Sequence, residues 1–269
     1  MSRLAITCTG LLMKSGRLLP RWVPADARVR RFLRSRVIPS RMEWVRIQQG
    51  IAQGLWIQID LAHERSWWAG HHEPALQAEL RRLVRKDLVM YDVGAHIGFY
   101  SLAAARLGAR VVAFEPDPES AERLRTHAER NNLTANIRVI EAAAWSESMP
   151  LIGFQRGLPR SQGGVSRGER RPVVATGPLI EVRAIRLDDF ADGGLGPHLI
   201  KIDVEGAESE VLEGAVETMS ASRPHLLVEV HTSTEEVAVT RFLSENRYKA
   251  RWEIPPEGFP RQGFASPSY

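Results

Sequence analysis

Charged and titratable side chains recur at the ends of two apolar segments in the C-terminal half of the chain. Lys201, Asp203 and Glu205 alternate with apolar residues in the first segment, and Glu229 and His231 do so in the second. Because strand side chains alternate between faces, each set shares one side of its strand. Charges are costly inside a parallel strand covered on both faces, so we expect them at the open carboxyl ends. If the two strands are neighbours, the five side chains converge on one site.

Such a site can take the proton of an alcohol during a group-transfer reaction. His231 has the ordinary pKa nearest to that task, and a carboxylate whose pKa is raised by neighbouring carboxylates is the next choice. We therefore predict His231 or Asp203 as the base, Glu205 and Glu229 as orienting groups and Lys201 as a balancing charge. The carboxylates and the histidine could also hold Mg²⁺ or Mn²⁺. That interpretation is less favoured because the sequence supplies no ligand geometry, so no metal ligand is assigned.

A glycine turn lies near the middle of the chain. Residues 88–101 read LVMYDVGAHIGFYS, an apolar run that ends in Asp92 and is followed by Gly94 and Gly98. The spacing of apolar residues then becomes helical until Gly108. This order is typical of a buried parallel strand, a tight turn and a helix.

A second apolar run, residues 110–114, ends in Glu115. An acidic residue at the tip of the next strand suits the two hydroxyls of a ribose. A dinucleotide site requires G-x-G-x-x-G, whereas this chain has D-x-G-x-x-x-G, with Asp92 before the first glycine. A carboxylate there repels phosphate and attracts an ammonium or sulfonium group. The sequence therefore predicts a nucleoside ligand rather than a pyrophosphate.

Three motifs, DVGAHIG, FEPDP and KIDVEGAE, resemble those of the FkbM family of S-adenosylmethionine-dependent methyltransferases. The resemblance extends over residues 56–252. It implies an α/β fold of the Rossmann-like class I methyltransferase type, a mostly parallel doubly wound sheet, here with an N-terminal helical and hairpin extension. His96 departs from the Asn that is usual in the family, and its side chain narrows the turn. The resemblance implies S-adenosylmethionine as the cofactor, bound by Asp92, Gly94, His96, Gly98, Glu115, Pro116, Ala143, Trp145 and Asp203.

Two groups of aromatic and acidic residues flank these motifs. Residues 141–145 follow a predicted third strand at 137–140, where the fold would place adenine. Trp145 could stack on that ring or pack in the core, and both alternatives stay open. Residues 67–74 resemble the family's lead-in segment, which implies that Trp68 and Glu73 are lid or substrate contacts. Without the resemblance, the tryptophans would be interpreted as core residues.

The domain plan has four parts. Residues 1–40 form a basic extension with a predicted helix at 25–37, which either packs on the domain or lies on an anionic membrane surface. Residues 41–87 contain a predicted hairpin and the helix 75–86. The methyltransferase core spans 88–253, with helices at 118–131, 207–218 and 235–245, and a hairpin insertion at 146–187. The arginine-rich tip of the insertion could meet an acidic acceptor or be a solvated loop. Residues 254–269 are predicted to be an irregular, proline-rich tail, and the sequence leaves open whether the seventh antiparallel strand of this fold is present.

Composition narrows the class of protein. The chain of 269 residues is 43% hydrophobic, which is enough for one sizeable globular core. The single Cys8 excludes a disulfide framework and a multi-cysteine metal site, and it fits a reducing cytoplasm. No apolar run reaches the length of a membrane span.

The most favoured function is O-methylation of a hydroxyl on a sugar, glycan or polyketide-type small molecule, as the family resemblance implies. A nucleic-acid methyltransferase is an alternative, because the arginines could track phosphates. The chain has no D/N-P-P-Y/F motif and no suitably placed cysteine, which argues against it. Asp92 and the missing third glycine of the dinucleotide motif argue against an NAD-binding oxidoreductase. A binding protein without catalysis is a further alternative, and the sequence leaves the oligomeric state open.

Overall fold

The computed structural model describes residues 40–156, 164–166, 178–190, 196–255 and 258–268. The chain divides into two compact units, residues 1–44 with 58–65 and residues 45–57 with 66–269. Strands β1 (Met42–Arg46) and β2 (Trp56–Asp60) form a two-stranded sheet where a hairpin was predicted. The predicted helix at 25–37 and most of the insertion tip lie outside the described residues. All of the candidate site belongs to the larger unit.

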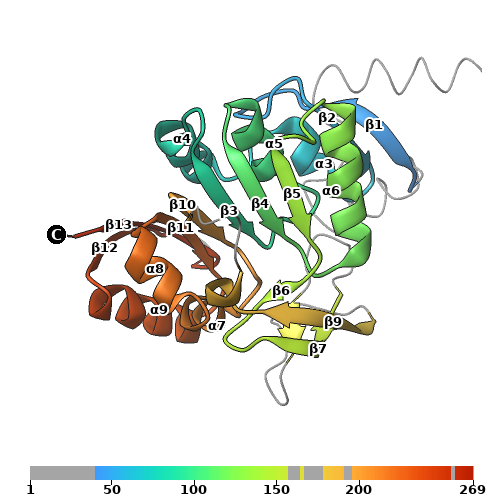
Figure 1. The fold of residues 1–269 in the computed structure, drawn as a ribbon. Helices are drawn as coiled ribbons and strands as arrows, with labels where there is room; N and C mark the ends of the chain where they lie inside the picture. The colour runs from blue at the N-terminus through green and yellow to red at the C-terminus, as the bar shows by residue number, and fades with distance from the viewer. Residues whose placement is uncertain (1–39, 157–163, 167–177, 191–195, 256–257, 269) are drawn as a thin grey trace, which may run out of the picture. The chain divides into compact units, whose positions relative to one another are not determined.

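The larger unit is built on a seven-stranded sheet of order β12-β13-β11-β10-β3-β4-β5 (Figure 1). All pairs among β11, β10, β3, β4 and β5 are parallel, whereas β13 is antiparallel to both of its neighbours. The class I methyltransferase fold is therefore confirmed. The strands are β3 Val89–Val93, β4 Arg110–Phe114, β5 Ile137–Ile140, β10 Leu199–Ile202, β11 His225–Val230, β12 Tyr248–Glu253 and β13 Arg261–Pro267.

The prediction of an irregular C-terminal tail was wrong. Strand β13 supplies the seventh, antiparallel strand, and Phe264 in its centre pairs with Leu227 of β11 and Arg251 of β12. The prolines that suggested irregular structure lie before the strand and at its last position, where they leave the hydrogen-bond ladder intact. Gly263 is needed because a Cβ there would lie 2.6 Å from the ring of Trp252.

Helices cover both faces of this sheet (Figure 1). They are α3 Arg65–Ala69, α4 Pro74–Leu83, α5 Phe99–Arg106, α6 Pro118–Arg130, α7 Glu208–Glu213, α8 Val216–Ser222 and α9 Ser233–Glu245, with a 3₁₀ turn η1 at Leu187–Asp189. The single helix predicted at 207–218 is two helices, α7 and α8. They separate after Gly214, which packs so closely that a Cβ would lie 2.0 Å from the carbonyl oxygen of Trp145.

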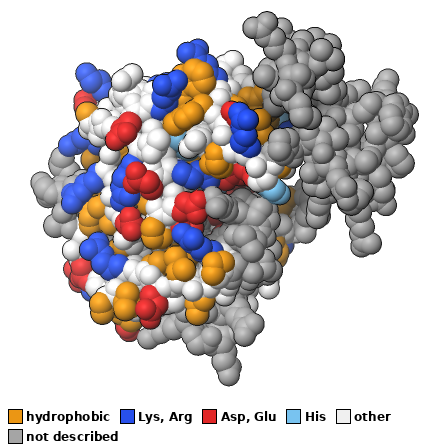
Figure 2. Space-filling view, turned by 90° about the vertical axis from the view of Figure 1, so that its right-hand side faces the viewer, with side chains coloured by type: hydrophobic (Ala, Val, Ile, Leu, Met, Phe, Trp, Pro, Cys, Tyr) orange, Lys and Arg blue, Asp and Glu red, His pale blue; other side chains and the backbone are white. Residues whose placement is uncertain are grey.

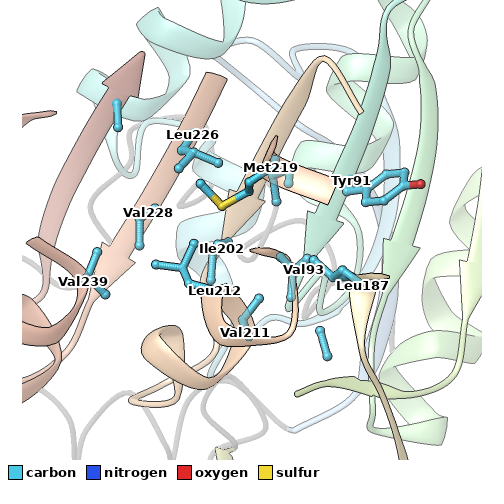
Figure 3. Packing of buried hydrophobic residues seen from close by; sticks show 14 of the residues in the cluster. Tyr91, Val93, Leu187, Ile202, Val211, Leu212, Met219, Leu226, Val228 and Val239 are labelled. Carbon is cyan, nitrogen blue, oxygen red and sulfur yellow. The ribbon is translucent and has the colours of Figure 1, made fainter. Parts of the chain in front are cut away.

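Strand alternation divides the sheet into an apolar face and a polar one. Tyr91, Val93 and Ile202 point into a cluster with side chains of α7, α8 and α9, among them Leu212 and Met219 (Figure 3). The intervening residues of the same strands must therefore point to the opposite face, on which α5 lies. Asp92, Lys201 and Glu229 alternate with these apolar residues and therefore lie on that opposite face.

The insertion forms a small sheet of its own. Its strands β6 (Ala143–Ala144), β7 (Met149–Gln155), β8 (Gly164–Ser166) and β9 (Leu179–Ile185) lie in the order β6-β9-β7-β8 (Figure 1). The two predicted strands, β7 and β9, pair antiparallel as expected. Because β6 pairs with β9 of this sheet, the chain that leaves β5 runs directly into the insertion.

Candidate active site

The turn after β3 is closed by glycine. Gly94 has a φ of +75°, and a Cβ on it would lie 1.8 Å from the backbone oxygen of Asp203. The ends of β3 and β10 can approach this closely only without a side chain at that position. His96 in the same turn also has a left-handed φ of +49°, which is uncommon for a residue other than glycine.

Glu115, at the end of β4, fixes two turns at once. Its Oε2 accepts a hydrogen bond from the backbone N–H of His96 at 2.7 Å, and its Oε1 accepts one from that of Asp117 at 2.9 Å. Burial raises the pKa of Glu115 to about 7, although these two backbone hydrogen bonds oppose the shift. The carboxyl group is thus poised to change its charge near neutral pH.

A cavity lies beside these turns at the carboxyl ends of β3, β4 and β10. Among the residues predicted to bind the cofactor, six line the cavity: Gly94, His96, Glu115, Pro116, Ala143 and Asp203. The predicted catalytic residues Lys201 and Glu205 line it as well. The remaining predicted residues, Asp92, Gly98, Trp145, Trp68, Glu73, Glu229 and His231, lie outside this lining.

Trp145 belongs to the core rather than to the cavity. Its side chain packs with Ile152, Val182 and Ala184 of the insertion sheet, and its backbone N–H donates to Ile185. Of the two alternatives, this packing favours a core position for Trp145, because β6 turns the chain into the insertion. Phe154 of β7 lines the cavity instead. The sequence suggested no role for Phe154, because only the pairing of β7 with β9 and of β9 with β6 brings it there.

Aromatic residues form another part of the lining. Trp67, Phe99 and Tyr100 contribute to the wall, whereas the predicted Trp68 does not. The Trp67 ring lies 5.6 Å from that of His96 and 4.3 Å from that of His72, measured between ring centroids. Composition cannot predict which of these two adjacent tryptophans on the short helix α3 faces the cavity.

Lys201 lies at the centre of the polar face. Its ammonium donates to the carbonyl oxygen of Gly94 at 2.9 Å and lies 3.3 Å from Asp92 and 3.4 Å from Asp203. Burial alone would lower the pKa of Lys201, but the neighbouring carboxylates outweigh it and raise the pKa. Asp92 is fully buried and accepts a hydrogen bond from the Ser101 hydroxyl at 2.6 Å. Asp92 therefore lies beside Lys201 and outside the cavity lining.

His231 is held among three carboxylates. Its Nδ1 lies 2.9 Å from Oε1 of Glu208, and its Nε2 lies 3.4 Å from Glu205 and 3.7 Å from Asp203. Burial lowers the pKa of this imidazole, but the hydrogen bond to Glu208 and the nearby carboxylates raise it to about 10. His231 is thus an imidazolium at neutral pH. Glu208 was assigned no role from the sequence, although it ends the motif KIDVEGAE.

The pKa values of the two remaining predicted carboxyl groups are also raised. Burial raises the pKa of Glu205 to about 7 against the attraction of His231, while Asp203 adds to the increase. Burial and the charge of Asp203 raise the pKa of Glu229 to about 9, so Glu229 is protonated at neutral pH. Glu205 also has a left-handed φ of +56°. Strain of this kind is common at functional sites.

Glu73 joins the cluster through Tyr100. The Tyr100 hydroxyl donates to Oε2 of Glu73 at 2.5 Å. Burial and the charge of Asp203 raise the pKa of Glu73. The side chain therefore lies behind the cavity wall, and Tyr100 is the group of this pair that lines the cavity.

Asp203, Glu205 and His231 could offer one ligand atom each to a divalent ion, because these atoms lie within 4.8 Å of one another. The attraction between the His231 imidazolium and the two carboxylates also explains why these three side chains lie close together. A metal site therefore stays a less favoured interpretation.

Comparison with known proteins places the chain in a family. The model of the methyltransferase FkbM domain matches residues 92–250, more than half of the chain. The chain belongs to the FkbM methyltransferase family. A hexuronic acid methyltransferase, AglP of Haloferax volcanii, is 30% identical over 60% of this chain and 63% of its own length. The 31-O-demethyl-FK506 methyltransferase FkbM of Streptomyces tacrolimicus is 31% identical over 55% and 67% of the two chains. The 2-O-methyltransferase NoeI of Sinorhizobium fredii is 30% identical over 64% and 77%. The chain thus spans somewhat less than two thirds of the AglP relative.

Two surface observations bear on partners. No helix in the described ranges is long and apolar enough to cross a membrane. On the face drawn in Figure 2, basic and acidic side chains of the described residues are interspersed. That part of the surface offers no continuous basic track for a phosphate backbone.

Proposed function

We propose that this protein transfers a methyl group from S-adenosylmethionine to a hydroxyl of a sugar, glycan or polyketide-type small molecule, in the cytoplasm. The observation that carries the proposal is the buried carboxyl of Glu115 at the tip of β4, in a cavity that also contains the anionic end of β10. Family membership and the hydroxyl-bearing substrates of the FkbM and NoeI relatives support the same reaction.

The lining residues fit this cofactor. A ribose diol would donate to Glu115, beside the tight turn at Gly94. Ala143 and Phe154 would bound the adenine, and the carboxylate of Asp203 would attract the positive sulfonium. When bound, the cofactor supplies an electrophilic methyl group on sulfur. The NAD alternative loses support because family membership favours methyl transfer. A nucleic-acid acceptor is less favoured because Asp203 and Glu205 would repel its phosphates.

The acceptor hydroxyl must lose its proton as its oxygen attacks the methyl carbon. His231 is already protonated at neutral pH, so its proposed part changes from base to orienting cation for Asp203 and Glu205. Glu205 lines the cavity, and its pKa of about 7 is nearest to the pH at which a general base works well. We therefore favour Glu205 as the proton acceptor and Asp203 as the group that positions the hydroxyl. Lys201 lies 3.4 Å from Asp203 and balances the charge of that carboxylate.

Calorimetric titration with S-adenosylmethionine, S-adenosylhomocysteine and NAD tests the cofactor assignment. The two adenosyl ligands should bind, and NAD should not. Binding of NAD alone would refute the proposal.

Substitution separates the base from the binding groups. Glu205→Gln should lower turnover at least about a hundredfold, while the Kd for S-adenosylhomocysteine changes little. Unchanged turnover in Glu205→Gln would exclude this residue as the base. Because the charge of His231 lowers the pKa of Glu205, His231→Gln should move the decrease in kcat/KM to higher pH if Glu205 is the titrating base.

A further inference from the structure

The part of the cavity at the end of β10 carries more carboxylates than cations. Four carboxyl groups lie beside only two cations, Lys201 and His231, among the described residues. They belong to Asp92, Asp203, Glu205 and Glu208, whereas Glu229 is protonated at neutral pH and adds no charge. The pKa values of Lys201 and His231 rise despite burial, which reports the same negative potential.

The two cations are already paired with groups of the protein. The Lys201 ammonium donates to the carbonyl oxygen of Gly94 and forms ion pairs with Asp92 and Asp203. Both ring nitrogens of His231 face carboxylates. Arg156, on the insertion, lies 2.5 Å from Asp117 and 4.0 Å from Glu119. An anionic acceptor entering here would meet carboxylates without a described cation to pair with it.

The cavity also offers an aromatic surface. Trp67 is only partly buried, and it lines the cavity together with Tyr100. An aromatic face packs against the C–H face of a sugar ring, and it attracts a nearby ammonium group. Carboxylate oxygens of Asp203 and Glu205 can accept hydrogen bonds from hydroxyl or ammonium protons. These groups together are suited to a ring that bears hydroxyl or amino groups.

We infer that the acceptor bound at Trp67, Asp203 and Glu205 is a neutral or amino-bearing polyhydroxylated ring, and that acid sugars are excluded. This inference rests on the proposed function and adds the charge class of the acceptor. It separates this chain from its hexuronic acid methyltransferase relative. An anionic ring here is repelled by carboxylates that outnumber the cations beside them, whereas a neutral or cationic ring is not, so the acceptors should be discriminated by charge.

The test compares matched acceptors that differ only in charge. Methyl glucoside, methyl glucosaminide and methyl glucuronide are incubated with the full chain and S-adenosylmethionine, and methyl incorporation is measured. The neutral or amino compound should have a kcat/KM at least about tenfold higher than the glucuronide. Equal or preferred methylation of the glucuronide, with or without added Mg²⁺, would overturn the inference.

A second measurement needs no acceptor, and it decides the question if none of the three sugars is methylated. Sinefungin carries a protonated amine in place of the methylsulfonium, whereas S-adenosylhomocysteine is neutral at sulfur. Sinefungin should bind at least about tenfold more tightly, and Glu205→Gln should reduce this ratio. Equal affinities would refute the negative potential and the inference with it. Failure of the proposed function is distinguishable, because then neither ligand binds.

Discussion

Protonation of Glu115 should control cofactor affinity. Because burial raises its pKa to about 7, lowering the pH below this value adds a proton to the group that would accept the ribose hydroxyls. Affinity for S-adenosylhomocysteine should therefore rise with pH up to about 7 and then level off. Each pH unit corresponds to about 1.4 kcal/mol, so the Kd at about pH 5.5 should be about 30-fold weaker than at the plateau. The ligand itself has no group that titrates in this range.

Glu115→Gln should remove this dependence. Both oxygens of Glu115 accept backbone N–H groups, from His96 and Asp117, so the amide nitrogen of glutamine must face one of these donors. We expect the variant to bind about 10- to 100-fold more weakly at about pH 8, the loss of one hydrogen bond to a charged group. Its Kd should be nearly constant between about pH 5.5 and 8. Glu181→Gln, at an exposed site on β9, is the matched control.

Isothermal titration calorimetry across this pH range measures both proteins. Circular dichroism at each pH confirms that they remain folded. A flat profile in the natural protein, or the same slope in Glu115→Gln, would refute the assignment of the titration to Glu115.

Four further substitutions and one additive test the remaining reasoning. Gly94→Ala should abolish folding or ligand binding, because its Cβ would lie 1.8 Å from a backbone oxygen. Gly258→Ala is the control: no atom lies within 4 Å of its Cβ, so it should lower the free energy of unfolding by only about 1 to 2 kcal/mol. Equal losses in the two variants would contradict the steric argument. Glu229 has a pKa of about 9 in the folded protein against 4.5 as the ordinary value, so its contribution to stability is full below pH 4.5 and is lost as the pH rises through 9. Glu229→Gln should therefore raise the melting temperature at about pH 8 and not at about pH 4, and a lowered value at about pH 8 would show that Glu229 is ionised. His231→Ala should destabilise the protein by about 3 to 5 kcal/mol in chemical denaturation, because it leaves buried Glu208 without its cation; a loss below about 1 kcal/mol would mean that the pair is solvated. Turnover should survive a chelator, and its loss with recovery on adding Mg²⁺ would establish the metal site.

Local sequence was enough to predict most elements of the larger unit. The run before Asp92 and the glycines after it predicted β3, the turn and α5, because a buried strand, a left-handed turn and a helix each require particular residue types at short range. Alternation along β10 and β11 likewise predicted which side chains share a face. The C-terminal strand was missed because Arg261–Pro267 acquires its strand character from pairing with β11 and β12, and prolines flank it.

The candidate site likewise has features that local sequence predicts and features that only the folded chain decides. Sequence by itself determined the chemistry present: a glycine turn, an acidic residue at the tip of β4, and charged residues at the ends of β10 and β11. Tertiary structure alone decided which of them act together and in which ionisation state. Glu208, distant in sequence, makes His231 an imidazolium, and the insertion sheet replaces Trp145 with Phe154 at the cavity. The physical reason is that residue types and backbone preferences are local, whereas burial and the fields of neighbouring charges depend on segments that meet only in the folded chain.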